Sequence, residues 1–292
     1  MSINPGLLGP YRLLNIVNTG QTSRIWQAYH DGEGKFYAVK SLLDQFRKNR
    51  EYTQFLRWEY GVGSTISHER IIQMRQFGIE RGTAYLAMEW FAAPNMKQWI
   101  RQGFENIGHM VPKIALQAAE AVAHFNSHGW VHRDIKPDNF LVTPEGDVKL
   151  IDFALARRTS GGLARLFSRK SKIVQGTRSY MSPEQIRGEA LDSRADMYSL
   201  ACTLFELVGG RPPFTGASAN DLLVKHLKSS PPSVQALNRE ATPEFSDLLR
   251  KALAKKTSSR LKSSEDFYNQ LRVTPILQNK PDPPKDSKEK EE

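Results

Sequence analysis

The chain has 292 residues, of which 39% are hydrophobic and 25% are charged. This composition excludes a mostly disordered chain, and the length suits two lobes or two domains. The net charge of +10 fits nucleic acid, an anionic membrane surface or acidic protein partners, and equally a solvated basic surface. The single cysteine, Cys202, excludes an internal disulfide, and its apolar neighbours predict a buried, unreactive thiol.

The N-terminus lacks the basic start and long apolar core of a secretory signal. No apolar run approaches the roughly 20 residues that span a bilayer, so we expect a soluble, cytoplasmic protein without a membrane span. Residues 1–10 are expected to form an N-terminal extension. Residues 276–292 are rich in proline and charge and are expected to form a disordered tail.

The first ninety residues are expected to form mostly strands, because β-branched and aromatic residues alternate between turn-forming residues. A charged segment at 44–66 interrupts them. Within it Phe55, Trp58 and Val62 stand at helical spacing, which predicts one apolar helix face. The expected strands lie at 11–17, 24–29, 35–42, 75–79 and 83–90.

Helices are expected to dominate beyond a change of character near residues 92–95. One apolar stripe runs from Val111 to Phe125, and further helices are expected at 196–208, 246–254 and 264–271. The layout is therefore a small N-lobe (11–90), a hinge (89–95) and a larger helical C-lobe (95–275). A cleft between two lobes is a usual place for a ligand.

The segment HRDIKPDN at 132–139, with Asp152 following it, carries the strongest chemical signal. Phosphoryl transfer needs metal ions, a cation near the phosphates and a group that orients the attacking hydroxyl. Asp152 and Asn139 offer the hard oxygen ligands that such metals prefer. Asp134 can accept the hydroxyl proton, and Lys136 can neutralise charge that develops on the γ-phosphate.

With these residues the chain resembles the eukaryotic-type protein kinases, and their bacterial Ser/Thr members in particular, over nearly all of residues 11–271. The resemblance implies an α+β, bilobal fold with a small β-rich N-lobe holding one helix and a larger α-helical C-lobe. It also implies a kinase domain at 11–275 that uses ATP with Mg²⁺ or Mn²⁺ to phosphorylate Ser and Thr hydroxyls of proteins. The catalytic residues would be Asp134, Lys136, Asn139 and Asp152, the last two as metal ligands.

The resemblance also implies an ATP site in the N-lobe. Lys40, in the motif Tyr-Ala-Val-Lys, would bind the α- and β-phosphates, and Glu59 in the following helix would pair with it. The glycine-rich loop departs from the family pattern, because only Gly20 of its three glycines is present. Asn18 and Ser23 stand at the other two positions, which predicts a weaker hold on the nucleotide. The further ATP-binding candidates are Ile16, Ile25, Ala38, Met88, Glu89 and Phe91.

A second departure is Ala154, which replaces the glycine that usually follows the metal-binding Asp and Phe; it is expected to restrict movement of that segment. Thr177 matches a threonine that seats the substrate in Ser/Thr kinases and contacts the catalytic Asp and Lys. Three further residues match structural positions of the family: a brace between Glu184 and Arg260, and Asp196 as an acceptor for the catalytic-loop backbone.

The segment that follows Asp152 is strongly basic. We expect Ser168 or Ser171 to be autophosphorylated, with Arg133 receiving the phosphate, because a phosphate can pair with nearby arginines. A solvated basic loop is the competing interpretation. Trans-autophosphorylation would bring two copies together as a homodimer.

Three other functions compete with this hypothesis. A pseudokinase would bind nucleotide as a scaffold without transfer; the eroded glycine loop favours it, whereas the complete set of catalytic residues opposes it. A small-molecule kinase is opposed by the peptide-seating segment around Thr177. A nucleic-acid-binding module rests on charge alone, and no nucleic acid partner is expected.

Overall fold

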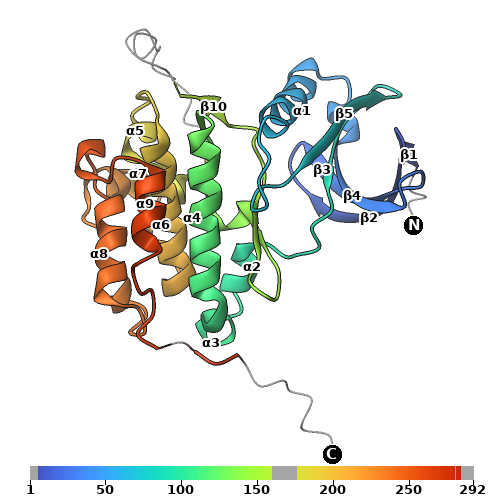
Figure 1. The fold of residues 1–292 in the computed structure, drawn as a ribbon. Helices are drawn as coiled ribbons and strands as arrows, with labels where there is room; N and C mark the ends of the chain where they lie inside the picture. The colour runs from blue at the N-terminus through green and yellow to red at the C-terminus, as the bar shows by residue number, and fades with distance from the viewer. Residues whose placement is uncertain (1–5, 160–175, 280, 284–292) are drawn as a thin grey trace, which may run out of the picture. The chain divides into compact units, whose positions relative to one another are not determined.

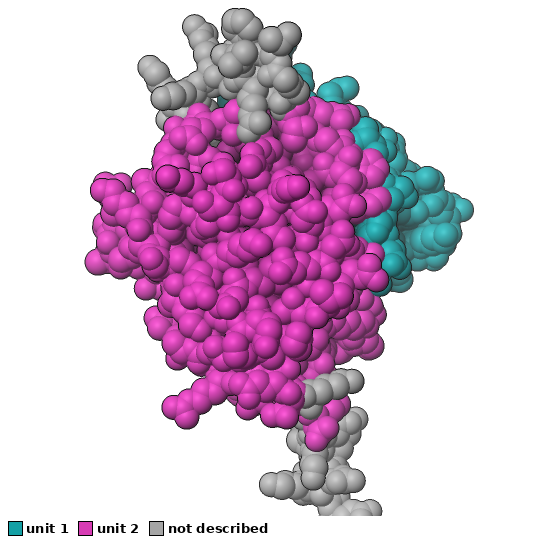
Figure 2. Space-filling view, turned by 60° about the vertical axis from the view of Figure 1, so that its left-hand side comes forward, with its two compact units in different colours: residues 1–92, 151–154 teal, residues 93–150, 155–292 magenta. Residues whose placement is uncertain are grey.

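The computed structural model describes residues 6–159, 176–279 and 281–283. The chain divides into two compact units, coloured separately in Figure 2. The first unit comprises residues 1–92 with 151–154, and the second comprises residues 93–150 with 155–292. Within the described residues no helix combines the length and the apolar character that crossing a bilayer requires.

The first unit is built on an antiparallel six-stranded sheet with the order β1-β2-β3-β4-β6-β5 (Figure 1). Alternate side chains of β4 are buried, which places Tyr37 and Val39 in the core and Ala38 and Lys40 on the other face. The strands are β1 (Leu7–Leu8), β2 (Tyr11–Thr19), β3 (Ser23–His30), β4 (Lys35–Leu42), β5 (Met74–Glu80) and β6 (Thr83–Glu89).

Helix α1 (Arg50–Gly63) packs against β5 and β6 and follows the short 3₁₀ helix η1 (Asp44–Phe46). The side chain of Asn49 caps its start by accepting hydrogen bonds from the first-turn backbone. The expected apolar face is wrong for Phe55 and Trp58, which are 37% and 38% exposed. The helix instead buries the face that carries Leu56, Glu59 and the expected Val62, and the Glu59 carboxylate pairs with Lys40 inside the unit.

The second unit is mainly helical, with α4 packed against α6 and α9 (Figure 1). Helix α6 is buried continuously from Ala195 to Val208, and the prediction of a buried thiol at Cys202 is confirmed. Its α-helices are α2 (Met96–Ile100), α3 (Phe104–Ile107), α4 (Val111–Ser127), α5 (Pro183–Ile186), α6 (Ser193–Gly209), α7 (Ala219–Lys228), α8 (Pro243–Ala252) and α9 (Ser264–Leu271).

Short strands hold the loop that carries the main sequence motif. Strand β7 (Trp130–Val131) pairs with β10 (Arg157–Arg158), and β8 (Phe140–Val142) pairs with β9 (Val148–Leu150). The loop between β7 and β8 includes the 3₁₀ helix η3 (Pro137–Asn139), and a second 3₁₀ helix, η5, spans Arg178–Tyr180. The remaining 3₁₀ helices are η2 (Gly108–Met110), η6 (Val234–Ala236) and η7 (Thr257–Ser259).

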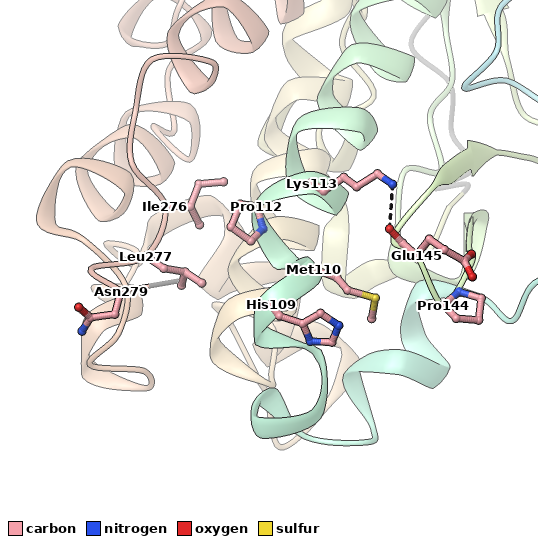
Figure 3. A pocket seen from close by; sticks show the side chains of 9 residues that line it. All are labelled: His109, Met110, Pro112, Lys113, Pro144, Glu145, Ile276, Leu277 and Asn279. Atoms are coloured by element: carbon pink, nitrogen blue, oxygen red, sulfur yellow. Dashed lines mark hydrogen bonds between the residues drawn. The ribbon is translucent and has the colours of Figure 1, made fainter. Parts of the chain in front are cut away.

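The chain after α9 packs back on the second unit. Ile276 and Leu277 are buried, and the backbone N–H of Gln278 donates to the carbonyl of Glu240 at 2.7 Å. Ordered structure therefore continues past the expected start of the tail at 276, whereas residues 280 and 284–292 lie outside the described residues. This segment lines a pocket of about 560 Å³ together with side chains from the start of α4 and from the β8–β9 turn (Figure 3).

Candidate active site

In the first unit, a lysine and two carboxylates meet. Lys40 Nζ on β4 lies 2.8 Å from Glu59 Oε2 on α1 and 3.5 Å from Asp152 Oδ1. Burial raises the pKa of Glu59 to about 7, against the opposing attraction of the Lys40 ammonium. The pKa of Lys40 is raised. Burial alone would lower it, but the attraction of the Asp152 and Glu59 carboxylates outweighs that effect, so the amine stays protonated.

The register of the sheet gathers several predicted nucleotide-binding residues around Lys40. Ile25 stands directly opposite Lys40 across the β3–β4 pair, and Met88 stands opposite Ala38 across the β4–β6 pair. Residues directly opposite each other in an antiparallel pair project from the same face. Four of the predicted ATP-binding side chains therefore share one face of the sheet.

The structure does not bring Ile16 to that face. Ile16 pairs with Trp26, whose side chain lies in the core on the other face of the sheet, and Ile16 is 41% exposed. The register shifts between Ile16 and Asn18, so the exposed Val17 occupies an irregular position next to the turn. Such a bulge has no clear signature in the sequence, so the side of the sheet on which Ile16 lies could not be predicted.

The turn after β2 and the end of β6 hold the other predicted ATP-binding residues. Gly20 closes the turn by donating its N–H to the carbonyl of Ser23 at 2.9 Å, and its φ is outside the left-handed region. The Glu89 side chain is engaged within the first unit, where its carboxylate accepts a hydrogen bond from the N–H of Gln73 at 2.7 Å. Phe91 is half-buried beyond the end of β6.

Asp152 has a strained backbone. Its φ of 67° lies in the left-handed region, which costs a non-glycine residue about 1–2 kcal/mol. The next residue, Phe153, is fully buried and anchors this segment against α1. A Cβ added to Gly63 would lie 2.9 Å from the Phe153 ring and 2.5 Å from Met74 Cγ, so the glycine makes the space that the ring fills.

In the second unit, the catalytic-loop residues converge on one carboxylate. Asp134 Oδ1 accepts hydrogen bonds from the N–H and the hydroxyl of Thr177, both at 3.0 Å. Lys136 Nζ lies 2.8 Å from Asp134 Oδ2 and donates to the Thr177 hydroxyl at 2.8 Å. Asn139 Nδ2 donates to the Asp134 carbonyl at 2.8 Å. The Asp134 carboxylate is therefore contacted by the Lys136 ammonium and the Thr177 hydroxyl, while the Asn139 amide holds the Asp134 backbone.

A buried carboxylate accepts hydrogen bonds from the backbone of this loop. Asp196 on α6 is 1% exposed and accepts the N–H groups of His132 at 2.7 Å and Arg133 at 2.9 Å. Burial raises the pKa of Asp196, against the opposing effect of these donors. The Asn126 side chain on α4 also donates to Asp196 at 2.7 Å and accepts from Ser264 at 2.7 Å. Sequence reasoning missed Asn126 and Ser264, which belong to no recognisable motif.

The segment after Thr177 is fixed by two further sets of contacts. Gln185 Nε2 donates to the Arg133 carbonyl at 2.9 Å, and Arg133 itself has a left-handed φ of 71°. The Tyr180 hydroxyl donates to Glu206 at 2.6 Å, and Glu206 also pairs with Lys97. Sequence reasoning missed Gln185, Glu206 and Lys97, although Gln185 directly follows the Ser-Pro-Glu segment that it identified.

The brace between Glu184 and Arg260 is a bidentate ion pair. Arg260 Nη1 and Nη2 donate to the two Glu184 oxygens at 2.7 and 2.8 Å, with the side chains 0% and 4% exposed. The same guanidinium donates to the carbonyls of Ala254 and Arg194, each at 2.8 Å. Arg260 therefore ties the loop before α9 to α5 and α6.

Arg133 is the expected receiver of a regulatory phosphate. Burial lowers its pKa, and the neighbouring Arg157 guanidinium lowers it further. Two close guanidinium groups form an electropositive site that a phosphate would neutralise. The predicted phosphorylation sites, Ser168 and Ser171, lie outside the described residues.

Each unit offers one donor of the kind that a divalent cation prefers. Asp152 supplies a carboxylate and Asn139 an amide oxygen, which are the hard ligands that Mg²⁺ and Mn²⁺ prefer. Since Asn139 uses its amide nitrogen to hold the Asp134 carbonyl, the amide oxygen is directed away from that carbonyl.

Comparison with known proteins identifies the family. Residues 11–270 match the family described as protein kinase domain, and this chain belongs to that family. The expected α+β kinase fold class is therefore confirmed.

The relatives are bacterial. The chain is 31% identical over 277 residues to the serine/threonine-protein kinase PrkC of Bacillus subtilis, covering 94% of this chain and 42% of PrkC. It is 31% identical over 267 residues to the serine/threonine-protein kinase PknA of Mycobacterium tuberculosis, covering 89% of this chain and 60% of PknA. The probable serine/threonine-protein kinase PknB of Lactococcus lactis is 28% identical over 268 residues, with 91% and 42% covered. The chain thus spans less than two thirds of the length of each of these relatives, and its domain is of the bacterial Ser/Thr kinase type.

Proposed function

We propose that this chain is a protein Ser/Thr kinase that transfers the γ-phosphate of ATP to Ser and Thr hydroxyls of proteins. The observation that carries the proposal is the contact of Thr177 with both Asp134 and Lys136. A protein that only binds nucleotide has no need for a hydroxyl that links a carboxylate to an ammonium ion. The relatives named as Ser/Thr kinases support the same assignment.

Asp134 is proposed to orient the acceptor hydroxyl and to take its proton. Its Oδ1 is held by Thr177 and its Oδ2 by Lys136, so the carboxylate is fixed in direction before a substrate arrives. Lys136 stabilises the negative charge that develops on the transferred group. Thr177 hydrogen-bonds to Asp134 and Lys136 and so fixes both side chains relative to the peptide-seating segment to which it belongs.

Nucleotide binding is assigned to the face of the sheet that carries Lys40. Lys40 contacts the phosphates, and Glu59 holds its ammonium in place. Ile25, Ala38 and Met88, on the same face, provide the apolar surface for the base. We propose Val17 in place of Ile16 as the residue of β2 that covers the nucleotide, since Ile16 pairs on the other face.

The cofactors in this proposal are ATP and Mg²⁺ or Mn²⁺, with Asp152 and Asn139 as the protein ligands. The metal, when bound, neutralises phosphate charge and orients the γ-phosphate. Protein substrates and a cytoplasmic location belong to the same proposal, because ATP is available there. Autophosphorylation of Ser168 or Ser171, in trans within a transient homodimer, would place a phosphate near Arg133 and Arg157.

The test is phosphoryl transfer by the purified chain. It is incubated with γ-labelled ATP and either Mg²⁺ or Mn²⁺, beside an Asp134→Asn variant, and label on Ser and Thr is counted. Label on the wild type and none on the variant supports the proposal. Absence of label on the wild type, with ATP binding measured separately, would establish a pseudokinase instead. The family match and the relatives named as Ser/Thr kinases do not favour that alternative.

A further inference from the structure

Two lysines next to the proposed acceptor site are neutralised within the second unit. Lys136 pairs with Asp134, and Lys97 pairs with Glu206, whose second oxygen accepts the Tyr180 hydroxyl. These pairs leave little charge for a substrate to meet at those positions. Any preference for charged substrates must come from side chains that remain outside such pairs.

Arg178 is such a side chain. It directly follows Thr177, it begins η5 and it is exposed. Within the part of the chain that the structure describes, no ion pair or hydrogen bond involves its guanidinium. The neighbouring residues 160–175 contain no Asp or Glu in the sequence, so they offer no carboxylate to Arg178 either.

The backbone of η5 turns Arg178 away from the buried network. Thr177 is directed to Asp134 and Tyr180 to Glu206, whereas the intervening Arg178 is exposed. A cation held on an ordered 3₁₀ turn one residue from the acceptor-binding threonine is placed to meet the peptide beside its acceptor. The net charge of +10 adds a general attraction for acidic substrates.

One exposed carboxylate follows the catalytic Asp134 and Lys136 in the chain and acts electrostatically on Tyr180 of η5. Asp138 belongs to η3, is exposed and precedes Asn139, and among the described residues it forms no ion pair. Two charges of opposite sign therefore lie near the same site. Asp138 provides a control, because a general field effect would strengthen the preference for anions in Asp138→Asn as it weakens that preference in Arg178→Ala.

We propose that Arg178 selects substrates with an anionic side chain, carboxylate or phosphate, within a few residues of the Ser or Thr acceptor. This inference rests on the proposed kinase function and names the substrate class of that site. The guanidinium offers planar paired donors that match the geometry of both anions. Because the pair would be partly exposed, the expected preference is about two- to five-fold in kcat/KM.

The experiment uses the full chain and a set of peptides with one Ser acceptor in an alanine-rich sequence. Glu, phosphoserine or Lys is moved through each position from four before to four after the acceptor. The measured quantity is kcat/KM relative to the alanine peptide, for the wild type, Arg178→Ala, Arg178→Glu and Asp138→Asn. We expect the wild type to prefer Glu, and phosphoserine more strongly, at one position near the acceptor.

Arg178→Ala should remove that preference, and Arg178→Glu should replace it with a preference for Lys at the same position, which a misfolded variant would not do. Asp138→Asn should leave the size of the preference for Glu unchanged, whereas a general field effect would increase it. A wild type that phosphorylates the peptides without any preference for an anion overturns the inference but leaves the kinase function intact. Persistence of the preference in Arg178→Ala also overturns it. Absence of transfer to every peptide and to the chain itself overturns the proposed function and the inference with it.

Discussion

Replacing Glu184 with alanine is expected to destabilise the second unit strongly. The change leaves the Arg260 guanidinium, 0% exposed, without the two charged hydrogen bonds of 2.7 and 2.8 Å that it makes in the native protein. Removing one partner of a buried ion pair costs about 3–5 kcal/mol. For a protein of this size each kcal/mol lowers Tm by about 2–4 °C, so a fall of about 10 °C is expected.

The assay is thermal unfolding followed by tryptophan fluorescence, with Arg260→Met and the double variant Glu184→Leu/Arg260→Met as controls. Each single change should destabilise more than the double change, because the double variant leaves no buried charge without a partner. A Tm within about 2 °C of the wild type for Glu184→Ala, equivalent to less than about 1 kcal/mol, would refute the reasoning. Such a result would mean that water reaches the guanidinium or that the remaining carbonyl contacts suffice.

Three further predictions test the active site. The pKa of Glu59 is raised to about 7, so its carboxylate is charged and paired with Lys40 above that pH and is protonated below it. KM for ATP should therefore rise as pH falls from 8 to 6, and Glu59→Gln should flatten this dependence. Thr177→Val should lower kcat by about ten- to a hundred-fold with little change in Tm, whereas Thr177→Ser should retain most activity. Gly63→Ala should destabilise by about 1–3 kcal/mol in urea unfolding and lower activity as well, because its Cβ displaces Phe153; unchanged stability would contradict the close packing.

The contacts that could be predicted from the sequence are those encoded in short motifs. Asp134, Lys136 and Asn139 share one loop of eight residues, so their spacing nearly determines their contacts. Thr177 and the pair Glu184–Arg260 were placed by resemblance, and the structure contains both sets of hydrogen bonds. These contacts were predictable because each residue sits in a recognisable local pattern.

Supporting contacts between distant residues were not predictable. Asn126 and Ser264 are 138 residues apart, and neither lies in a sequence motif that predicts the hydrogen bond between them. The partly buried pair of Lys97 and Glu206 spans α2 and α6 and has no sequence signature. Such pairs depend on how whole helices pack, which periodicity does not specify.

Two errors have specific physical causes. Apolar spacing on α1 indicated Phe55 as part of the buried face, but the helix is rotated so that Glu59 reaches Lys40. The buried face therefore carries Leu56 and Val62 together with the charged Glu59, which a count of apolar residues does not identify. On β2, Ile16 was expected to contact ATP, but it pairs with Trp26 on the other face, next to a bulge between Ile16 and Asn18.

The fit between Gly63 and Phe153 has a consequence for the evolution of this domain. The two residues are 90 positions apart in the sequence, yet the ring occupies the space that the missing side chain leaves. A relative that gains a larger residue at the position of Gly63 would need a smaller one at the position of Phe153 or Met74. These positions are therefore expected to covary, and their substitutions to be tolerated only as compensated pairs.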